Sequence, residues 1–362
     1  MEGTTFPTMD YYEFSGEAVT DAEGVLYMED CPPAGLPLSS VCLPAVYFLI
    51  FLAGVSGNVF VIAVLRGKRQ KDGRLVDTFV LNLAAADLVF VLTLPLWAVS
   101  ALQEHRWAFG DGLCKLSSYV IAVNRCSNVF FLTCMSADRY LAVVRMLDSR
   151  FLRTARCVRL TCAGVWALSL ALGMPALLFR RARDPDGEGV ECLEDTESRA
   201  FQVLILASFF LAFVLPLLVI VFCYGAILVQ LRRPSGGIGG GSGGKAQAEA
   251  RRRRRHSLKI VFAIVAAFLL SWIPFNVLKV VLIGSRMRGV ALSCGAMAAL
   301  ETGLVLSSCL AFFSSCANPA IYLCLDRHFR RRARRLCLGC SGRPGPRRGG
   351  SASSTSFRTS ES

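Results

Sequence analysis

The residues with the clearest chemical capacity form the triplet Asp138-Arg139-Tyr140, in which an acid, a base and a phenol stand side by side. The triplet closes a long apolar run that begins at Cys114 and can cross a bilayer as a helix. It therefore places an acid–base pair where lipid gives way to water. The alternative is an ordinary charged helix end, because a tripeptide alone is weak evidence.

Two further charged residues lie inside apolar runs. A carboxylate such as Asp87 costs about 2.5–3.5 kcal/mol at such a depth, so it should face a bundle interior and have a partner. Arg125 lies fourteen residues before Arg139, about four helical turns toward the other side of the membrane. A buried arginine marks a functional position. We predict that Arg125 receives a ligand's acidic group; the alternative is an internal salt bridge to Glu301 or to a loop acid.

Seven apolar stretches must position these residues. Each is long enough to span roughly 30 Å of hydrocarbon as a helix, with every backbone hydrogen bond made internally. The composition agrees, because the 362 residues are 54% hydrophobic and only 18% charged. The stretches are Leu36–Leu65, Leu75–Leu102, Leu116–Val144, Leu160–Phe179, Ala200–Leu231, Ile260–Gly284 and Thr302–Leu325.

Basic residues gather on one side of these stretches. They occupy the first, third and fifth connections and the segment after the last stretch, whereas residues 1–41 contain no Lys or Arg. By the positive-inside rule the basic side is cytoplasmic and the N-terminus is extracellular. The net charge of +14 is then a membrane signature, and no nucleic-acid partner is expected.

The predicted fold class is an all-α membrane protein, a seven-transmembrane helix bundle with a short amphipathic eighth helix. Its parts are an acidic extracellular arm (1–35), the bundle (36–325), the eighth helix on the inner membrane surface (326–340) and a cytoplasmic tail (341–362).

Both ends carry candidate modification sites. The arm sets Tyr11, Tyr12 and Tyr27 beside acids, as tyrosine sulfation requires. Cys337 and Cys340 follow the basic segment, where palmitoylation is favoured over a zinc site, because a single C-x-x-C pair is weak evidence for zinc. Serines and threonines in residues 351–362 are candidates for receptor kinases, whose phosphates would attract arrestin.

One marked residue stands in each stretch, and the set resembles the signature of the rhodopsin-like G-protein-coupled receptors. Thr93-Leu94-Pro95, the sequence Leu141-Ala142-Val143 after the triplet, and an additional outer cysteine pair resemble the chemokine and chemoattractant branch. The marked residues are Asn58, Asp87, Arg139, Trp166, Pro216, Trp272 with Pro274, and Asn318 with Pro319 and Tyr322.

The resemblance implies a plasma-membrane receptor for a secreted peptide or chemokine-like protein, which signals through a heterotrimeric G protein, with the inhibitory class expected, and through arrestin. It also implies two disulfides, Cys114–Cys192 and Cys31–Cys294. A non-signalling decoy receptor is the main alternative, although the intact triplet argues against it. A transporter would show internal repeats, and an enzyme is not expected because no nucleophile–base set is present.

The same resemblance implies a switch. At rest Arg139 pairs with Asp138; on activation it contacts the G protein, while Tyr224 and Tyr322 fill the space left by an outward swing of the sixth stretch. Phe268, Trp272 and Pro274 form the hinge relay. For Phe268 alone the alternative is simple aromatic packing at a proline kink.

Two pockets complete the predictions. Asp87 is expected at the centre of a sodium pocket, and the alternative is a carboxylate held by polar side chains without an ion, or protonated; no other cofactor is expected. Ser308 stands where many chemokine receptors carry a glutamate, which favours an acidic ligand group such as a peptide's C-terminal carboxylate. The sodium set is Asp87, Asn124, Asn128, Ser314 and Asn318, and the ligand set is Trp97, Arg125, Lys279, Glu301 and Ser308.

Overall fold

The computed structural model describes residues 19–20, 26–27, 39–67, 75–145, 154–184, 187, 189–232, 243–290 and 292–340. Within this part of the chain, seven segments are long and apolar enough to cross a membrane, which confirms the predicted seven-helix bundle. The segments are Val41–Arg66, Leu75–Leu102, Gly110–Val143, Ala155–Phe179, Arg199–Arg232, Leu258–Arg288 and Cys294–Leu325.

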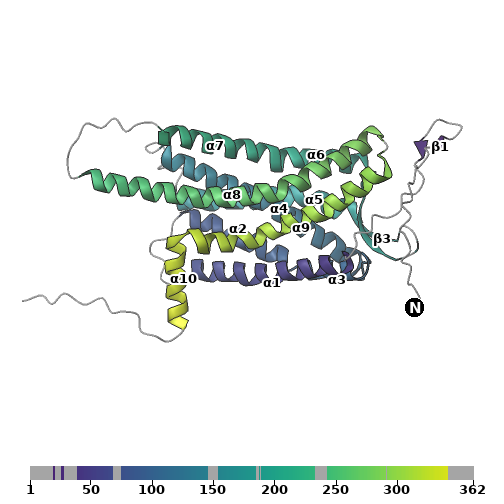
Figure 1. The fold of residues 1–362 in the computed structure, drawn as a ribbon, viewed down its shortest axis with the longest axis horizontal. Coiled ribbons are helices and arrows are strands. Elements are labelled where there is room, and N and C mark those ends of the chain that lie inside the picture. Colours follow the sequence, from purple (N-terminus) through teal and green to yellow (C-terminus); the bar gives the residue numbers. More distant parts are fainter. Residues whose placement is uncertain are drawn as a thin grey trace, which may run out of the picture.

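The helices lie side by side along the long axis of the molecule, and α10 crosses that axis at the end opposite β3 (Figure 1). The charge rule makes the α10 end cytoplasmic and the β3 end extracellular. The helices are α1 (Ser39–Arg66), α2 (Leu75–Val91), α3 (Leu94–Leu102), α4 (Gly110–Val143), α5 (Ala155–Phe179), α6 (Arg199–Phe209), η1 (Phe210–Val214), α7 (Leu215–Arg232), α8 (Gly243–Arg288), α9 (Cys294–Leu325) and α10 (Arg327–Cys340). Two antiparallel pairs of strands accompany them, β1 (Val19–Thr20) with β2 (Leu26–Tyr27) and β3 (Arg180–Arg183) with β4 (Glu191–Glu194).

Several helices begin before the apolar stretch that predicts them. The seventh span starts at Cys294 rather than Thr302, because the Ser293 hydroxyl accepts a hydrogen bond from the Ala296 N–H and caps the first turn. In the same way Thr154 caps α5. Hydropathy marks only the part of a helix that lies in lipid, so it cannot locate ends that lie in water.

Two spans are interrupted near a proline. The second span is interrupted for two residues between α2 and α3, just before Pro95, and there the Thr93 hydroxyl donates to the carbonyl oxygen of Phe90 at 2.7 Å. The fifth span contains the π-helical turn η1 just before Pro216, although the sequence predicts one continuous stretch. Proline has no N–H to continue the α-helical ladder, which accounts for both irregularities.

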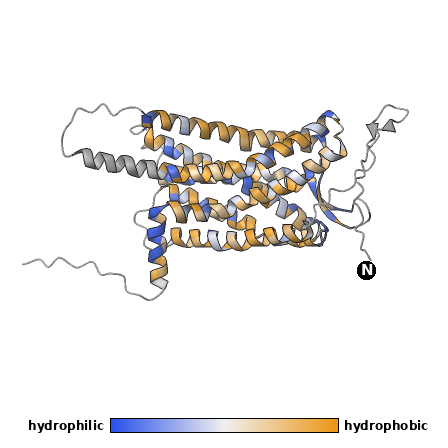
Figure 2. Cartoon of the chain, in the orientation of Figure 1, coloured by the Kyte–Doolittle hydropathy of each residue, from blue (hydrophilic) through white to orange (hydrophobic). Residues whose placement is uncertain are grey.

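The bundle is apolar outside and partly polar inside. The surface of the helices is mainly hydrophobic in Figure 2, and large side chains such as Leu49, Phe222 and Leu270 are exposed along it. In contrast, Asp87 and Asn58 are almost completely buried. This pattern suits a protein whose surroundings are lipid, because every buried polar group then needs a partner inside the bundle.

The eighth helix, α10, is held to the bundle at three points. Asp326 caps it by accepting hydrogen bonds from the His328 and Phe329 N–H groups at 2.7 and 3.1 Å. The buried Phe329 ring contacts Tyr322, and Arg332 donates to the buried Asp77 carboxylate at 2.7 Å. The predicted amphipathic helix therefore packs Phe329, from its apolar side, against the bundle.

Candidate functional site

A cavity of about 310 Å³ opens on the extracellular half of the bundle. Four members of the predicted ligand set line it, namely Trp97, Arg125, Lys279 and Ser308. Glu301 does not line it and is exposed, because it lies one turn nearer the outer end of α9 than the lining residues of that helix.

The second outer loop (residues 180–198) forms one wall of this cavity. The Cys114–Cys192 disulfide joins its strand β4 to the start of α4, with the two Cα atoms 5.6 Å apart, as the family resemblance implies. The Asp111 carboxylate accepts from the Ala182 N–H at 3.0 Å and fixes β3 to the same helix. The loop is therefore anchored on both strands, which gives the side chains that it points into the cavity defined positions.

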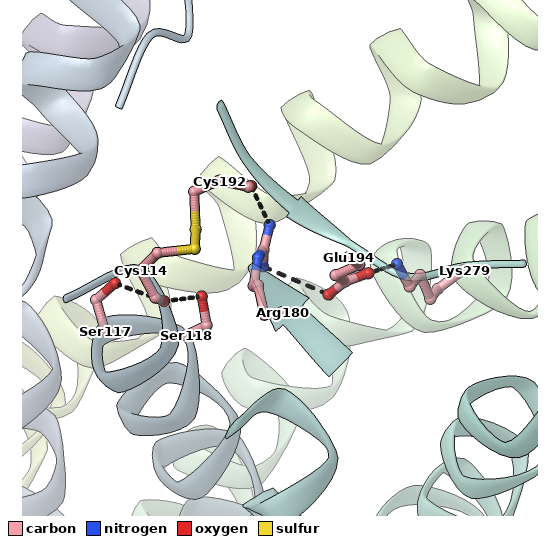
Figure 3. Close-up of polar contacts among 7 residues, drawn as sticks. All are labelled: Cys114, Ser117, Ser118, Arg180, Cys192, Glu194 and Lys279. Atoms are coloured by element: carbon pink, nitrogen blue, oxygen red, sulfur yellow. Dashed lines mark hydrogen bonds and ion pairs between the residues drawn. A yellow bond between two sulfur atoms is a disulfide. The ribbon is translucent and has the colours of Figure 1, made fainter. Parts of the chain in front are cut away.

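Two of these side chains, Arg180 and Glu194, line the cavity although the sequence does not predict it. They face each other across the two strands, and Arg180 Nη1 lies 3.4 Å from Glu194 Oε1. Lys279 on α8 donates to the other carboxylate oxygen of Glu194 (Figure 3). The Arg180 guanidinium also lies over the Trp97 ring, 5.2 Å from its centroid, in a cation–π contact.

Arg125 lies deeper in the same cavity and is half-buried. Among the described residues, no carboxylate lies within 4.0 Å of its guanidinium, so neither alternative salt bridge, to Glu301 or to a loop acid, is formed directly. Glu194 is near enough to interact with Arg125 electrostatically. Its two oxygens, however, are turned to Arg180 and Lys279.

The electrostatics of Glu194 follow from these neighbours. Burial by itself would raise the pKa of Glu194, but the positive charges of Lys279, Arg180 and Arg125 outweigh burial and lower this pKa to about 2. The carboxylate is therefore ionised at neutral pH.

Asp87 lies at the centre of a polar cluster in the middle of the bundle. Its Oδ1 atom accepts from Asn124 at 3.0 Å, from Asn128 at 2.7 Å and from Ser315 at 2.8 Å, and its Oδ2 atom accepts from Asn318 at 2.9 Å. This agrees with the expectation that Asp87 has polar partners in the interior. It also corresponds to the alternative in which polar side chains hold the carboxylate without an ion.

The arrangement does not fit a sodium ion as it stands, because three amide N–H groups and a single hydroxyl face the carboxylate, rather than a set of oxygen ligands. Ser314, expected in the sodium set, instead donates to the carbonyl oxygen of Ala311 and accepts from Trp272 Nε1 at 3.3 Å. Its neighbour Ser315 contacts Asp87 in its place. Sodium binding stays a prediction.

The cytoplasmic end holds the Asp138–Arg139 pair. Arg139 Nη2 lies 3.0 Å from Asp138 Oδ2, the contact expected of the resting state. Tyr140 packs against Phe222, and Tyr224 packs edge-on against Phe262 of α8. Tyr224 of the predicted switch thus lies between α7 and α8, the helix that is expected to swing outward.

Between the two ends, the hinge residues form a continuous aromatic column in α8. The ring centroids of Phe268 and Trp272, and those of Trp272 and Phe275, are 5.9 Å apart, and Pro274 lies inside the helix beside them. Trp272 lines the outer cavity and also contacts Ser314, so this column connects the cavity floor to α9.

The remaining predicted sites are placed only in part. Cys294 is disulfide-bonded, but Cys31 lies outside the described residues, so the bridge between them stays a prediction. Tyr11 and Tyr12 also lie outside, and only the backbone of Tyr27 is described, in β2. Cys337 is exposed on α10, which ends at Cys340.

Comparison with known proteins identifies the family. The sequence model of the family described as "7 transmembrane receptor (rhodopsin family)" matches residues 57–322, well over half of the chain. The chain belongs to this family. The receptor is 43% identical to mouse "Probable G-protein coupled receptor 25" over 346 residues, 95% of this chain and 90% of the relative.

Two other relatives indicate the branch. Mouse "G-protein coupled receptor 15" is 36% identical over 337 residues, 93% of this chain and 88% of the relative. Dog "C-X-C chemokine receptor type 2" is 34% identical over 303 residues, 83% of this chain and 79% of the relative. These matches confirm the resemblance to the chemokine branch. The chain is thus a multi-pass plasma-membrane receptor of the peptide type, and its relatives are signalling receptors rather than enzymes.

Proposed function

We propose that the receptor binds a secreted peptide or chemokine-like protein through an acidic group, and that it activates a heterotrimeric G protein of the inhibitory class. The observation that carries this proposal is the charge of the outer cavity. Its described lining residues include three cations, Arg125, Arg180 and Lys279, against the single acid Glu194. A cavity with excess positive charge at the floor of an extracellular opening favours an anionic ligand group.

Within this cavity Arg125 is the proposed recipient of the ligand's acid, which we take to be a C-terminal carboxylate. Its guanidinium makes no direct ion pair with a described carboxylate, and its planar fork suits bidentate binding. Lys279 lines the same space and would assist in binding the acid, whereas Trp97 and Ser308 would contact the residues that precede it.

The signal would pass inward along α8. Trp272 lies at the floor of the cavity, and its neighbours Phe268 and Pro274 form a point where the helix can bend. An outward swing of the inner half of α8 would open the Tyr224–Phe262 contact. Arg139 would then exchange Asp138 for the G protein.

Further partners belong to the same proposal. Receptor kinases would phosphorylate the tail, and arrestin would bind the phosphates. Palmitoyl chains on Cys337 and Cys340 would fix α10 to membrane lipid. Sulfation of the arm tyrosines would add negative charge outside the cell, where it attracts a basic part of the ligand.

The test is ligand-dependent nucleotide exchange on a purified G protein, with the receptor reconstituted in lipid. Secreted peptides are screened in pairs with free and amidated C-termini, and we expect activity only from the free acid. Arg125→Ala and Arg125→Lys should both lower the potency of the active peptide at a normal surface level, and unchanged potency in both would remove Arg125 from the proposal.

The same assay addresses the decoy alternative. Arg139→Ala should bind the active peptide at the cell surface yet fail to stimulate exchange, because the switch residue is missing. A wild-type receptor that binds the peptide but never stimulates exchange on any G protein would instead support a non-signalling receptor.

A further inference from the structure

The receptor supplies a carboxylate of its own to the cationic cavity. Glu194 sits at the end of β4, two residues after Cys192, whose disulfide to Cys114 anchors the strand. Directly after it, the Asp195 N–H donates to the carbonyl oxygen of Phe179 at 2.8 Å. The backbone on both sides of Glu194 is therefore fixed, and its side chain lies between Arg180 and Lys279 (Figure 3).

Both carboxylate oxygens of Glu194 are engaged by cations. Oε1 pairs with Arg180, which also donates to the carbonyl oxygen of Cys192 at 3.3 Å, and Oε2 accepts from Lys279. These contacts are what a ligand carboxylate would make in the same cavity. The Glu194 side chain is 27% exposed and the Lys279 side chain 17%, so the pair lies at the cavity wall within reach of an entering group.

The pair also joins two parts of the molecule. Glu194 belongs to the second outer loop, whereas Lys279 lies on α8, seven residues and about two turns outward of Trp272. While the pair is intact, the outer half of α8 is tied to the loop. Arg286, nearer the outer end of α8, also pairs with Thr196 and Glu197 of the loop, so opening the Glu194–Lys279 pair would remove the tie that lies closer to the hinge relay.

We propose that Glu194 is a built-in mimic of the ligand's acid: it occupies Lys279 and Arg180 before a ligand binds, and an entering carboxylate displaces it and breaks the contact that Glu194 makes with α8. This inference rests on the proposed function, because it assumes an acidic ligand group. It makes Glu194 a residue that determines specificity, since only a ligand that replaces the lost charge pairs can open the contact. A neutral amide could not, because two cations would be left without a counter-charge.

The experiment measures binding of 4-phenylbutyrate and its neutral analogue 4-phenylbutyramide to the purified full-length receptor. Glu194→Gln removes the competing charge and keeps the shape of the side chain. We expect it to bind the carboxylate about tenfold more tightly than wild type, the gain expected if Glu194 holds the cations about nine-tenths of the time. Affinity for the amide should not change.

Glu197→Gln is the matched control. Glu197 lies in the same loop and pairs with Arg286, but it is exposed and does not line the cavity. This variant makes the same change of charge and should bind 4-phenylbutyrate as wild type does. An equal gain in both variants would show a general charge effect and overturn the proposal.

The binding experiment gives a different result if Glu194 has only a structural role. If Glu194 only holds the loop to α8, Glu194→Gln lowers the melting temperature without any gain in carboxylate affinity, and the inference is wrong. Should Glu194→Gln fail to fold, Glu194→Asp replaces it. Aspartate keeps the charge but is shorter by one methylene, so a partial gain is expected, and no gain at all would overturn the proposal.

Arg125→Ala separates this inference from the proposed function. If Glu194→Gln tightens binding while Arg125→Ala leaves it unchanged, the displacement stands and Arg125 is not the recipient of the acid. If Arg125→Ala abolishes carboxylate binding while Glu194→Gln has no effect, the proposed recipient stands and the displacement is wrong.

Discussion

Exchanging the carboxylate of Asp87 for an amide should destabilise the receptor through one identifiable contact. Asp87 Oδ1 accepts from Asn124, Asn128 and Ser315, and Oδ2 accepts from Asn318 Nδ2 at 2.9 Å. If the remaining oxygen of Asp87→Asn keeps the three donors, its new amide nitrogen faces the Asn318 nitrogen. Two donors then meet, and both are buried.

The magnitude follows from that single lost bond. A buried donor left without an acceptor costs about 1–3 kcal/mol, so we expect a loss of about 2 kcal/mol. At about 2–4 °C per kcal/mol for a protein of this size, the melting temperature should fall by about 4–8 °C. The assay is thermal unfolding of the purified receptor in one detergent, with choline chloride in place of sodium chloride.

The reciprocal exchange provides the decisive comparison. Asn318→Asp alone would turn two carboxylates toward each other and should be the least stable variant. In the double variant Asp87→Asn/Asn318→Asp, the new carboxylate at position 318 can accept from the new amide at position 87. We expect it to melt above both single variants, and a double variant that melts at the sum of the two single losses would refute the reasoning.

Three further predictions concern other parts of the receptor. Gly173→Ala should lower the melting temperature by an amount equivalent to about 1–3 kcal/mol, because its Cβ would lie 2.8 Å from Val123 Cγ2, whereas Gly164→Ala in the same helix meets nothing within 4 Å and should raise it. For Glu194, burial raises the pKa but its cationic neighbours outweigh burial and lower the pKa from the ordinary 4.5 to about 2. Its ion pairs therefore contribute fully above about pH 4.5 and are lost as the pH falls toward 2. The difference in melting temperature between wild type and Glu194→Gln should therefore stay constant from about pH 5 to pH 8 and shrink at lower pH. The sodium prediction requires that sodium chloride, compared with choline chloride, raises the melting temperature of wild type but not of Asp87→Asn, and equal responses would remove it.

The positions and orientation of the spans could be read from the sequence because a bilayer imposes a one-dimensional rule. Each crossing needs a long apolar run with internally satisfied backbone bonds, and basic residues collect on the cytoplasmic side. The same rule makes a charge inside a run conspicuous, which is why Asp87 and Arg125 were found without a structure. Adjacent residues such as Asp138 and Arg139 need no tertiary information to be paired.

The sequence could not locate the site residues that lie outside the apolar runs, or those whose contacts depend on how a helix is rotated and how deep the cavity is. Ser315 rather than Ser314 reaches Asp87, a matter of rotation that hydropathy does not specify for a fully apolar helix. Glu301 lies outside the cavity because it is one turn nearer the outer end of α9 than the lining residues, and hydropathy does not fix the depth of the cavity. The positions of Arg180 and Glu194 depend on a hairpin in a polar loop, on its strand register and on a disulfide to a distant helix. Only the folded chain brings those groups together with Lys279, and so only the tertiary structure decided that the cationic cavity holds an acid of its own.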